Sequence, residues 1–340
     1  MLSVLVALLP VSAFLALLVL FDSFKLVAPR RLIQALVAGA GAAIAAALLH
    51  RYLLADATGL SPQTLSRYVA PVTEEILKAL FVVYALRRRF VGFLVDAAII
   101  GFAIGTGFAL IENIDYLRQL AVPQIWLWIA RGFGTAMMHA MTSAAVAIMA
   151  KSLIDRYPGR GIVNILPGLL VAIVLHSVFN HVLVSPLLVA TVLMVLLPLV
   201  VLFVFDRSER ATREWVGDGL DLDVELLTIV KSSIFGNTRL GRYLTELKDR
   251  FPGPVVADMF CLLQLDLELS IRAKGMLMAR QHGLNIPVDE DIRSRLAERT
   301  YLHKSIGPTG LLALRPLQVT NDRDDWLRYL LQESGRRAGK

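Results

Sequence analysis

Several side chains that can carry chemistry lie within apolar segments of the sequence. Glu74 and Glu75 are adjacent, and Lys78 follows on the same predicted helix at a spacing that reaches either carboxylate. On insertion scales an ionised side chain at the centre of a membrane helix costs at least ~2.5–3.5 kcal/mol, so its presence there indicates function. Two adjacent carboxylates with one lysine leave an excess negative charge or a shared proton, and such a group can act as a general base on water.

The remaining polar groups come from separate apolar segments. Glu112 and His139 belong to two of them, and His176 and Asn180 are i and i+4 on one helix face of a third. Ion pairs and interhelical hydrogen bonds that only stabilise the fold are the alternative interpretation of such residues. For Lys78 a pairing role is enough to explain its presence.

The elements that must position these residues are membrane helices. The chain has 340 residues, 56% of them hydrophobic, and a mean hydropathy of +0.61, which is typical of a membrane protein. Apolar stretches of about 20 residues are long enough to span a bilayer. We predict an all-α polytopic membrane helix bundle with about seven transmembrane helices, near residues 2–21, 32–54, 69–86, 94–115, 126–150, 162–185 and 187–205.

Charge divides the chain into two parts. Residues 1–205 hold 8 of the 28 acidic and 14 of the 35 basic residues, and we interpret them as a transmembrane domain. Residues 206–340 have the charge density of a soluble domain, show helical periodicity and carry no catalytic motif. Most of the net charge of +7 lies in the membrane part, where basic loops explain it, so we predict no nucleic-acid binding.

The basic residues also predict an orientation. One set of loops contains most of them: Lys25, Arg30, Arg31, Arg87, Arg88, Arg89, Lys151, Arg156, Arg160, Arg207, Arg210 and Arg213. The opposite set has only Arg51, Arg67 and Arg118. The positive-inside rule places the first set in the cytoplasm. We therefore expect a multi-pass protein of the cell membrane, with its N-terminus outside and residues 206–340 in the cytoplasm.

Depth in the membrane relates the polar groups to one another. At a rise of ~1.5 Å per residue, the glutamate pair, Glu112 and the His176–Asn180 pair all fall in the outer half of the bilayer. His139 joins them only if its span begins near Arg131. The sequence therefore predicts one polar cluster near the outer face.

Taken in order, these residues resemble the PrsW family of intramembrane proteases. The matching elements, over roughly residues 65–185, are Glu74-Glu75-x-x-Lys78, Phe108-x-x-x-Glu112-Asn113, His139 and His176-x-x-x-Asn180. The pattern is also similar to the wider superfamily that contains the CAAX prenyl proteases. The resemblance implies an endopeptidase that cleaves membrane-anchored proteins at or near the outer face, as in site-one cleavage of an anti-sigma factor.

The resemblance also implies roles for individual residues. Glu74 or Glu75 would activate water, and His176 with Asn180 would stabilise the oxyanion. The CAAX relatives carry a histidine at the position of Glu112. The role of that histidine in holding water must therefore pass to His139 or to a carboxylate, which favours the PrsW branch and argues against a prenylated substrate.

A metal is not the first expectation. The sequence has no His-Glu-x-x-His motif, and its single cysteine, Cys261, excludes an internal disulfide and a cysteine-based zinc site. We therefore predict no cofactor, with zinc left open. Three of its ligands could come from Glu75 or Glu112 together with His139 and His176.

Two other functions use the same residue types. A proton-coupled transporter also places Glu, His and Lys in the membrane, but the sequence shows no inverted repeat and its polar groups cluster in one half of the bilayer. A membrane sensor or scaffold with a degenerate protease core would instead bind a cytoplasmic protein through residues 206–340. The intact Glu74-Glu75 and His176–Asn180 pairs argue against degeneracy.

Overall fold

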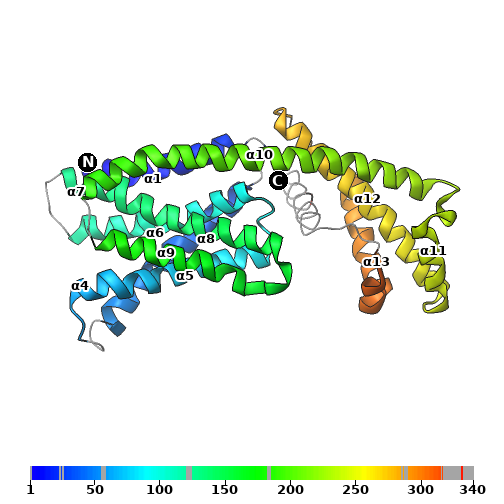
Figure 1. Cartoon of the computed structure of the whole chain (residues 1–340), viewed down its shortest axis with the longest axis horizontal. Coiled ribbons are helices and arrows are strands. Elements are labelled where there is room, and N and C mark those ends of the chain that lie inside the picture. Colours follow the sequence, from blue (N-terminus) through cyan, green and yellow to red (C-terminus); the bar gives the residue numbers. More distant parts are fainter. Residues whose placement is uncertain are drawn as a thin grey trace. The chain divides into compact units, whose positions relative to one another are not determined.

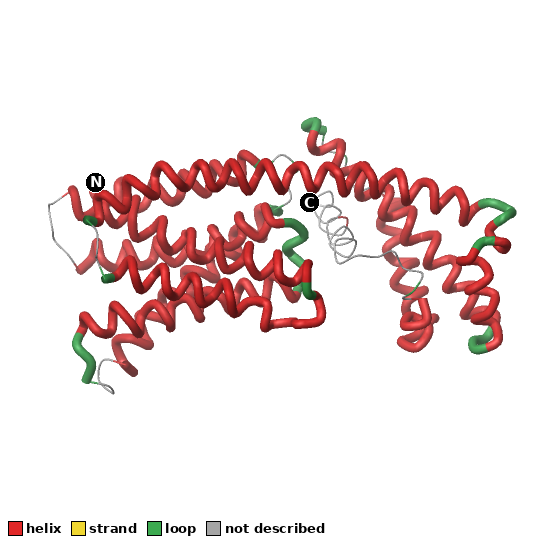
Figure 2. Tube along the Cα trace, in the orientation of Figure 1, coloured by secondary structure: helices red, strands yellow, loops and turns green. Residues whose placement is uncertain are grey.

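The computed structural model describes residues 2–22, 24, 27–54, 59–119, 125–181, 185–284, 286, 290–314, 316 and 331. Helices account for most of these residues, and no strand occurs among them (Figure 2). The chain divides into two compact units, Met1–Glu209 and Arg210–Lys340. The boundary falls within one long helix, α10, which extends from Pro186 to Lys231.

The first unit is a bundle whose long helices run side by side (Figure 1). In chain order these are α1 (Leu2–Phe21), α2 (Pro29–Leu48), α5 (Ala70–Arg87), α6 (Leu94–Gln119), α8 (Ala136–Arg156), α9 (Leu166–Asn180) and the start of α10. Shorter π-helical, 3-10 and α-helical segments extend or join them: η1 (Leu49–Leu54), α4 (Pro62–Thr64), η2 (Leu65–Val69), α7 (Ile125–Ile129), η3 (Ala130–Thr135) and η4 (Pro158–Ile165).

Five helical segments among the described residues are long and apolar enough to cross a membrane. They are Leu2–Phe21, Pro29–Tyr52, Leu94–Gln119, Ile125–Arg156 and Gly159–Asn180, which confirms the predicted all-α membrane bundle. The predicted span at 69–86 is helix α5, whose charged residues set it apart from a simple apolar span. The predicted span at 187–205 coincides with the start of α10, where many side chains lie outside the described residues. The count of seven stays a prediction.

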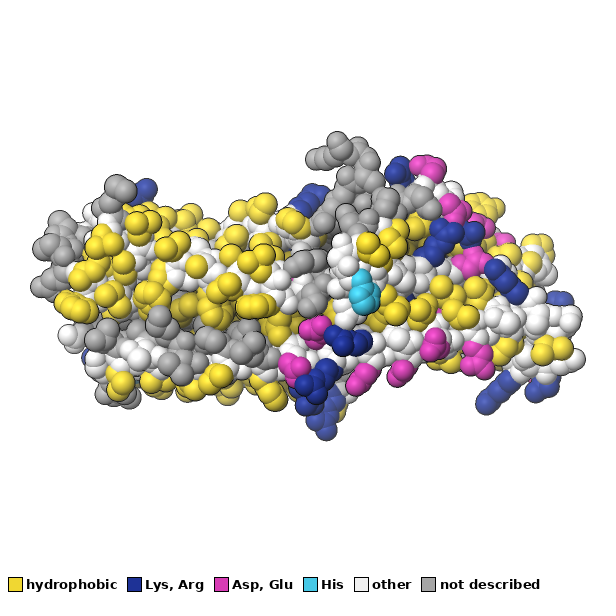
Figure 3. Space-filling view, turned by 90° about the horizontal axis from the view of Figure 1, so that it is seen from above, with side chains coloured by type: hydrophobic (Ala, Val, Ile, Leu, Met, Phe, Trp, Pro, Cys, Tyr) yellow, Lys and Arg dark blue, Asp and Glu magenta, His cyan; other side chains and the backbone are white. Residues whose placement is uncertain are grey.

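Helix α6 forms the centre of the first unit. In its most apolar stretch 83% of the residues are buried, against 22–28% in α1, α2 and α9. The outer helices turn large apolar side chains outward, such as Val37 at 64% exposed and Leu170 at 63%. Figure 3 shows this apolar surface over the first unit, while charged side chains gather over the second. Lipid is the environment in which such a surface is stable.

Glycines let other helices pack closely on α6. A Cβ atom at Gly105 would lie 2.1 Å from the backbone oxygen of His139 on α8, so only glycine allows this approach. Gly101 meets the backbone of α8 in the same way, which agrees with the small-xxx-small pair in the sequence. The contact at Gly105 fixes the backbone of His139, one of the predicted site residues, against α6.

The second unit consists of the end of α10 with η5 (Phe235–Asn237), α11 (Arg239–Glu246), η6 (Leu247–Asp249), α12 (Gly253–Gln281) and α13 (Glu290–Leu314). Leu262 and Leu277 of α12 are fully buried in its core. A buried ion pair joins Lys274 of α12 to Asp223 of α10 at 2.6 Å. Helix α13 bends at Gly307, whose φ of 70° is left-handed and suits glycine.

Candidate active site

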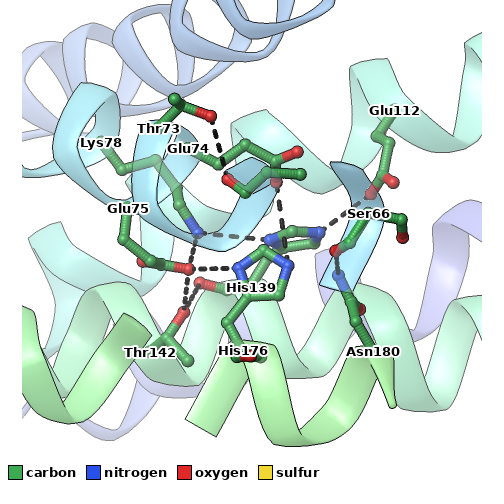
Figure 4. Close-up of polar contacts among 12 residues, drawn as sticks. Ser66, Thr73, Glu74, Glu75, Lys78, Glu112, His139, Thr142, His176 and Asn180 are labelled. Atoms are coloured by element: carbon green, nitrogen blue, oxygen red, sulfur yellow. Dashed lines mark hydrogen bonds and ion pairs between the residues drawn. The ribbon is translucent and has the colours of Figure 1, made fainter. Parts of the chain in front are cut away.

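Four helices bring the predicted polar residues together in one cluster (Figure 4). Helix α5 carries Glu74, Glu75 and Lys78 near its start, and α8 carries His139 near its start. The ends of two other helices supply the rest, with Glu112 on α6 and the pair His176 and Asn180 on α9. His139 joins the cluster through its contacts with Lys78 and Glu112, although the helical segment that carries it begins at Ile125 and not near Arg131, as the predicted depth had required.

Glu75 is the most enclosed member of the cluster. Its side chain is fully buried, and its Oε1 atom accepts three hydrogen bonds. Lys78 Nζ donates at 2.7 Å and His176 Nδ1 at 2.8 Å, and Thr142 Oγ1, at 3.1 Å, shares its one hydrogen with the backbone oxygen of His139. A carboxylate held by so many donors is fixed in place, and it holds His176 in turn.

The lysine connects this carboxylate to the second histidine. Lys78 is 1% exposed, and its Nζ atom lies 3.2 Å from His139 Nδ1. A charged ammonium group only donates, so His139 accepts at Nδ1 and carries its hydrogen on Nε2. That nitrogen lies 2.9 Å from Glu112 Oε2. His139 is thus oriented from both sides.

Arginine 131 completes the far side of the cluster. Its NH2 atom lies 3.2 Å from Glu112 Oε1, and its Nε atom donates to Asn113 Oδ1 at 3.0 Å. The guanidinium also stacks on the ring of Tyr116, 3.5 Å from the centroid. Glu112 therefore bridges Arg131 and His139 and serves as an anchor for the imidazole.

Glu74 differs from its neighbour in sequence. Its side chain is 13% exposed, and its two oxygens point toward two different histidines. Oε2 lies 3.8 Å from His176 Nε2, and Oε1 lies 3.9 Å from His50 Nδ1. Since both distances exceed a hydrogen bond, this carboxylate keeps its acceptor capacity for another group.

Asn180 is held at the edge of the cluster. Its Nδ2 atom donates to the backbone oxygen of Ser66 at 2.9 Å, and Ser177 donates to the oxygen of Arg67 at 2.7 Å. Both acceptors belong to the π-helix η2, so the end of α9 is fastened to this segment. An amide nitrogen carries two hydrogens, so the bond to Ser66 uses only one of those on Asn180.

A cavity of about 820 Å³ opens onto these groups. Its lining includes Glu74, Glu112, His139, His176 and Asn180, whereas Glu75 and Lys78 lie behind it. The wall is otherwise largely apolar, with residues such as Ile111 and Phe179. A concave apolar site with a few convergent polar groups is the usual form of a substrate pocket.

Sequence reasoning missed three residues at this site. Thr142 binds Glu75, and Thr73 and His50 bind each other beside Glu74. A lone threonine in an apolar helix gives no signal, because it commonly bonds to its own backbone. His50 did give such a signal, because a histidine within the second predicted span is itself a polar group in the membrane.

A family model described as PrsW family intramembrane metalloprotease matches residues 28–205. The chain belongs to this family. Among curated proteins and among solved structures, no match to the chain was found. PrsW membership makes the chain an intramembrane protease, as the order of its motifs implied, and it supports that function over a transporter or a scaffold.

The family description raises the question of a metal in this PrsW protein. Glu74, His139 and His176 offer one ligand atom each, and these atoms lie within 4.8 Å of one another. Two imidazoles and a carboxylate are the ligand set of one class of catalytic zinc site. The structure thus brings Glu74 into the group, where the sequence had suggested Glu75 or Glu112.

The surroundings of the two imidazoles test this fit. His176 donates from Nδ1 to Glu75, as metal-binding histidines usually do to a carboxylate, and this directs Nε2 toward Glu74. His139 faces a lysine instead and fits less directly. The donor set suits zinc in type, with the Glu75–His176 pair already arranged as in metal sites. As a ligand His176 needs the Nε2 lone pair, whereas as an oxyanion donor it needs a hydrogen there, so one role excludes the other.

Proposed function

We propose that this PrsW protein is an endopeptidase that cleaves membrane-anchored proteins near the outer membrane face, with Glu74 as the proton acceptor for the attacking water. One observation carries the assignment. Glu74 lines the cavity with acceptor capacity to spare, whereas Glu75 lies behind the cavity wall, where Oε1 faces three donors and Oε2 is buried away from the cavity. The adjacent carboxylates thus have separate roles, in which Glu74 takes the proton and Glu75 orients His176 and Lys78.

The remaining side chains support one hydrolytic sequence. Glu74 takes a proton from water as the oxygen attacks the scissile carbonyl, and then passes that proton to the leaving amine. Asn180 donates its second amide hydrogen to the developing oxyanion, an interaction typically worth ~2.7–4 kcal/mol. Glu112 and Lys78 hold His139 in one tautomer and one orientation.

Zinc, when bound, would be held by His176, Glu74 and His139, the last after giving up the hydrogen bond that its Nδ1 lone pair accepts from Lys78, and it would supply a Lewis acid that polarises the carbonyl and activates water. Glu74 Oε2 faces His176, while Oε1 faces away toward His50. The two oxygens of one carboxylate can therefore serve a ligand role and a proton-accepting role separately. Under this assignment Asn180 carries the oxyanion role that the sequence gave to both His176 and Asn180.

The proposed depth follows from where the charges lie on the helices. Glu75 is separated from Arg87 by twelve residues along α5, or ~18 Å at 1.5 Å per residue. His139 is likewise at the opposite end of α8 from Lys151 and Arg156. Since the positive-inside rule assigns those basic ends to the cytoplasm, the cavity belongs to the outer half of the bilayer. A membrane-anchored anti-sigma factor, cut on its outer side, is the substrate class we propose.

The test compares three variants of the full chain in cells and after purification. We expect Glu74→Gln to abolish cleavage without changing the thermal midpoint, because the side chain keeps its shape. Glu75→Gln is expected to lower both the cleavage rate and the thermal midpoint, because it leaves the Lys78 ammonium buried without a counter-charge. The control is Asp115→Asn, a carboxylate on the same cavity wall, which is expected to retain activity.

Two measurements give the outcome. Membrane proteins that accumulate with Glu74→Gln and not with wild type identify the substrate, and near-normal cleavage by Glu74→Gln would refute the proposed base. Zinc content measured on the same preparations tests the metal. We expect about one ion per chain in wild type and its loss in His176→Ala. Activity that survives complete zinc removal would restrict the chemistry to the side chains.

A further inference from the structure

Histidine 50 lies next to the proposed base but belongs to none of the motifs in the sequence. It is part of η1, a π-helical segment that continues α2, and its side chain lines the cavity at 16% exposed. π-Helical turns are rare, and they often occur at functional sites. The ring lies between Thr73 and Glu74 of helix α5.

Threonine 73 determines which nitrogen of this ring carries a hydrogen. Its Oγ1 atom lies 3.1 Å from the backbone oxygens of both Val69 and Ala70, and we assign its single hydrogen to those carbonyls. The same Oγ1 lies 2.6 Å from His50 Nε2. With its hydrogen committed, the hydroxyl accepts here, and His50 donates from Nε2.

The other nitrogen of the neutral ring is therefore an acceptor. His50 Nδ1 faces Glu74 Oε1 at 3.9 Å, so two acceptors point at each other across a gap too long for a direct hydrogen bond. A water molecule has two hydrogens and can donate to both at ordinary distances. The arrangement accordingly selects a small donor with two hydrogens.

We propose that His50 is a positioning residue that holds the attacking water together with Glu74. One hydrogen of the water points to Glu74 Oε1, which removes it, and the other is held by His50 Nδ1. The oxygen lone pair is then directed away from both residues. This inference rests on the proposed function, because it requires Glu74 to be the base.

Two substitutions of His50 separate its two nitrogens. Gln keeps a donor near the position of Nε2 but places no acceptor at the position of Nδ1, whereas Asn keeps a polar group at the position of Nδ1. We expect His50→Gln to lower kcat about 10- to 100-fold with KM within about twofold, since displaced reactants react more slowly without binding more weakly. His50→Asn is expected to retain a larger share of kcat.

Threonine 73 gives an independent pair of variants. Thr73→Val removes the hydroxyl that fixes the tautomer, so we expect kcat to fall about 3- to 30-fold. Thr73→Ser restores the hydroxyl and is expected to recover most of the rate. His181→Gln is the matched control, because this histidine binds the backbone oxygen of Ser177 and is absent from the cavity lining.

All variants are measured as full chains in detergent. The substrate is one fluorogenic transmembrane peptide, chosen from a library as the peptide that the wild-type protein cleaves fastest. Unchanged kcat in His50→Gln, equal losses in His50→Gln and His50→Asn, or a rise in KM alone would overturn the proposal. Loss of bound zinc from His50→Gln would also overturn it, because His50 would then be a ligand. Glu74→Gln is assayed in parallel. If it is active, the proposed function fails; if it is inactive while His50→Gln is fully active, only this inference fails.

Discussion

Lys78 and Glu75 form an ion pair that is almost completely removed from solvent. Their side chains are 1% and 0% exposed, and the contact is 2.7 Å. Removing one partner of such a pair typically costs ~3–5 kcal/mol because the other charge is left buried alone, whereas neutralising both is far less harmful. This asymmetry gives a test of what the lysine does.

We expect Lys78→Met to lower the thermal midpoint and the yield of folded protein. The double variant Lys78→Met with Glu75→Gln is expected to recover much of this loss, since no unpaired charge remains. Neither variant is expected to be active, because Lys78→Met removes the partner of His139 and the double variant also replaces the carboxylate that holds His176. A double variant that is no more stable than Lys78→Met would show that the pair is not the source of stability.

At the level of single residues the sequence predicted which polar groups meet. It did not predict which of the two glutamates is enclosed and which one faces the cavity. The i,i+3 and i,i+4 spacings allowed Lys78 to pair with either glutamate. Adjacent helical positions are separated by about 100°, and only the positions of α8 and α9 decide which carboxylate is enclosed. The choice between Glu74 and Glu75 therefore depends on tertiary contacts with Thr142 and His176.

Among the elements, the contact between α6 and α8 directly fixes the backbone of His139, a residue of the candidate site. A Cβ atom at Gly105 would lie 2.1 Å from the His139 oxygen and 2.5 Å from the Ala140 Cα, and neither backbone atom can move by itself. We expect Gly105→Ala to separate the two helices, destabilise the protein by ~1–3 kcal/mol and reduce activity by displacing His139.

Gly41→Ala is the matched control for this prediction. Gly41 also lies in a membrane helix, α2, but a Cβ atom there meets nothing within 4 Å. Alanine at this position is expected to leave activity unchanged and to stabilise the helix slightly, by up to ~1 kcal/mol. Thermal midpoints and cleavage rates of both variants in detergent make the comparison. Equal effects at the two positions would contradict a role for close packing at Gly105.

The helices themselves were largely predictable, while the irregular turns between them were not. Long apolar stretches and the Gly101–Gly105 pair indicated membrane helices that pack closely. The π-helices η1 and η2 gave no signal, because their sequences do not differ from those of an ordinary helix. These turns place His50 beside Glu74 and present the Ser66 oxygen to Asn180.

At the scale of the whole molecule, residues 206–340 lie outside the protease family match. The helical periodicity of this part of the sequence corresponds to the end of α10, to α11, to α12 and to α13. These helices are joined by ion pairs such as Arg299–Asp266 at 2.6 Å and Lys274–Asp223, which is consistent with a folded soluble unit. We propose that this unit lies in the cytoplasm and regulates the protease or recruits a protein partner.

Two observations separate this unit from the chemistry. The family match ends at residue 205, and every residue that lines the described cavity lies between Ala43 and Asn180. The proposed orientation adds a physical reason, because a bilayer core of ~30 Å would separate a cytoplasmic unit from a site in the outer half. Side chains of the second unit are then unable to reach the scissile carbonyl.

A chain that ends after Arg213 tests this division. It keeps all the lining residues and the basic residues that orient the last predicted span, and it removes the second unit almost entirely. We expect it to insert and to cleave a short fluorogenic peptide within about threefold of the full chain, because the groups that stabilise the transition state are unchanged. Cleavage of the natural membrane-anchored substrate is expected to change more.

The full chain with Cys261→Ser, a substitution at an exposed thiol of α12, is the control for altering the second unit without removing it. A truncated chain that is correctly inserted yet inactive on every substrate would make residues 214–340 part of the catalytic machinery.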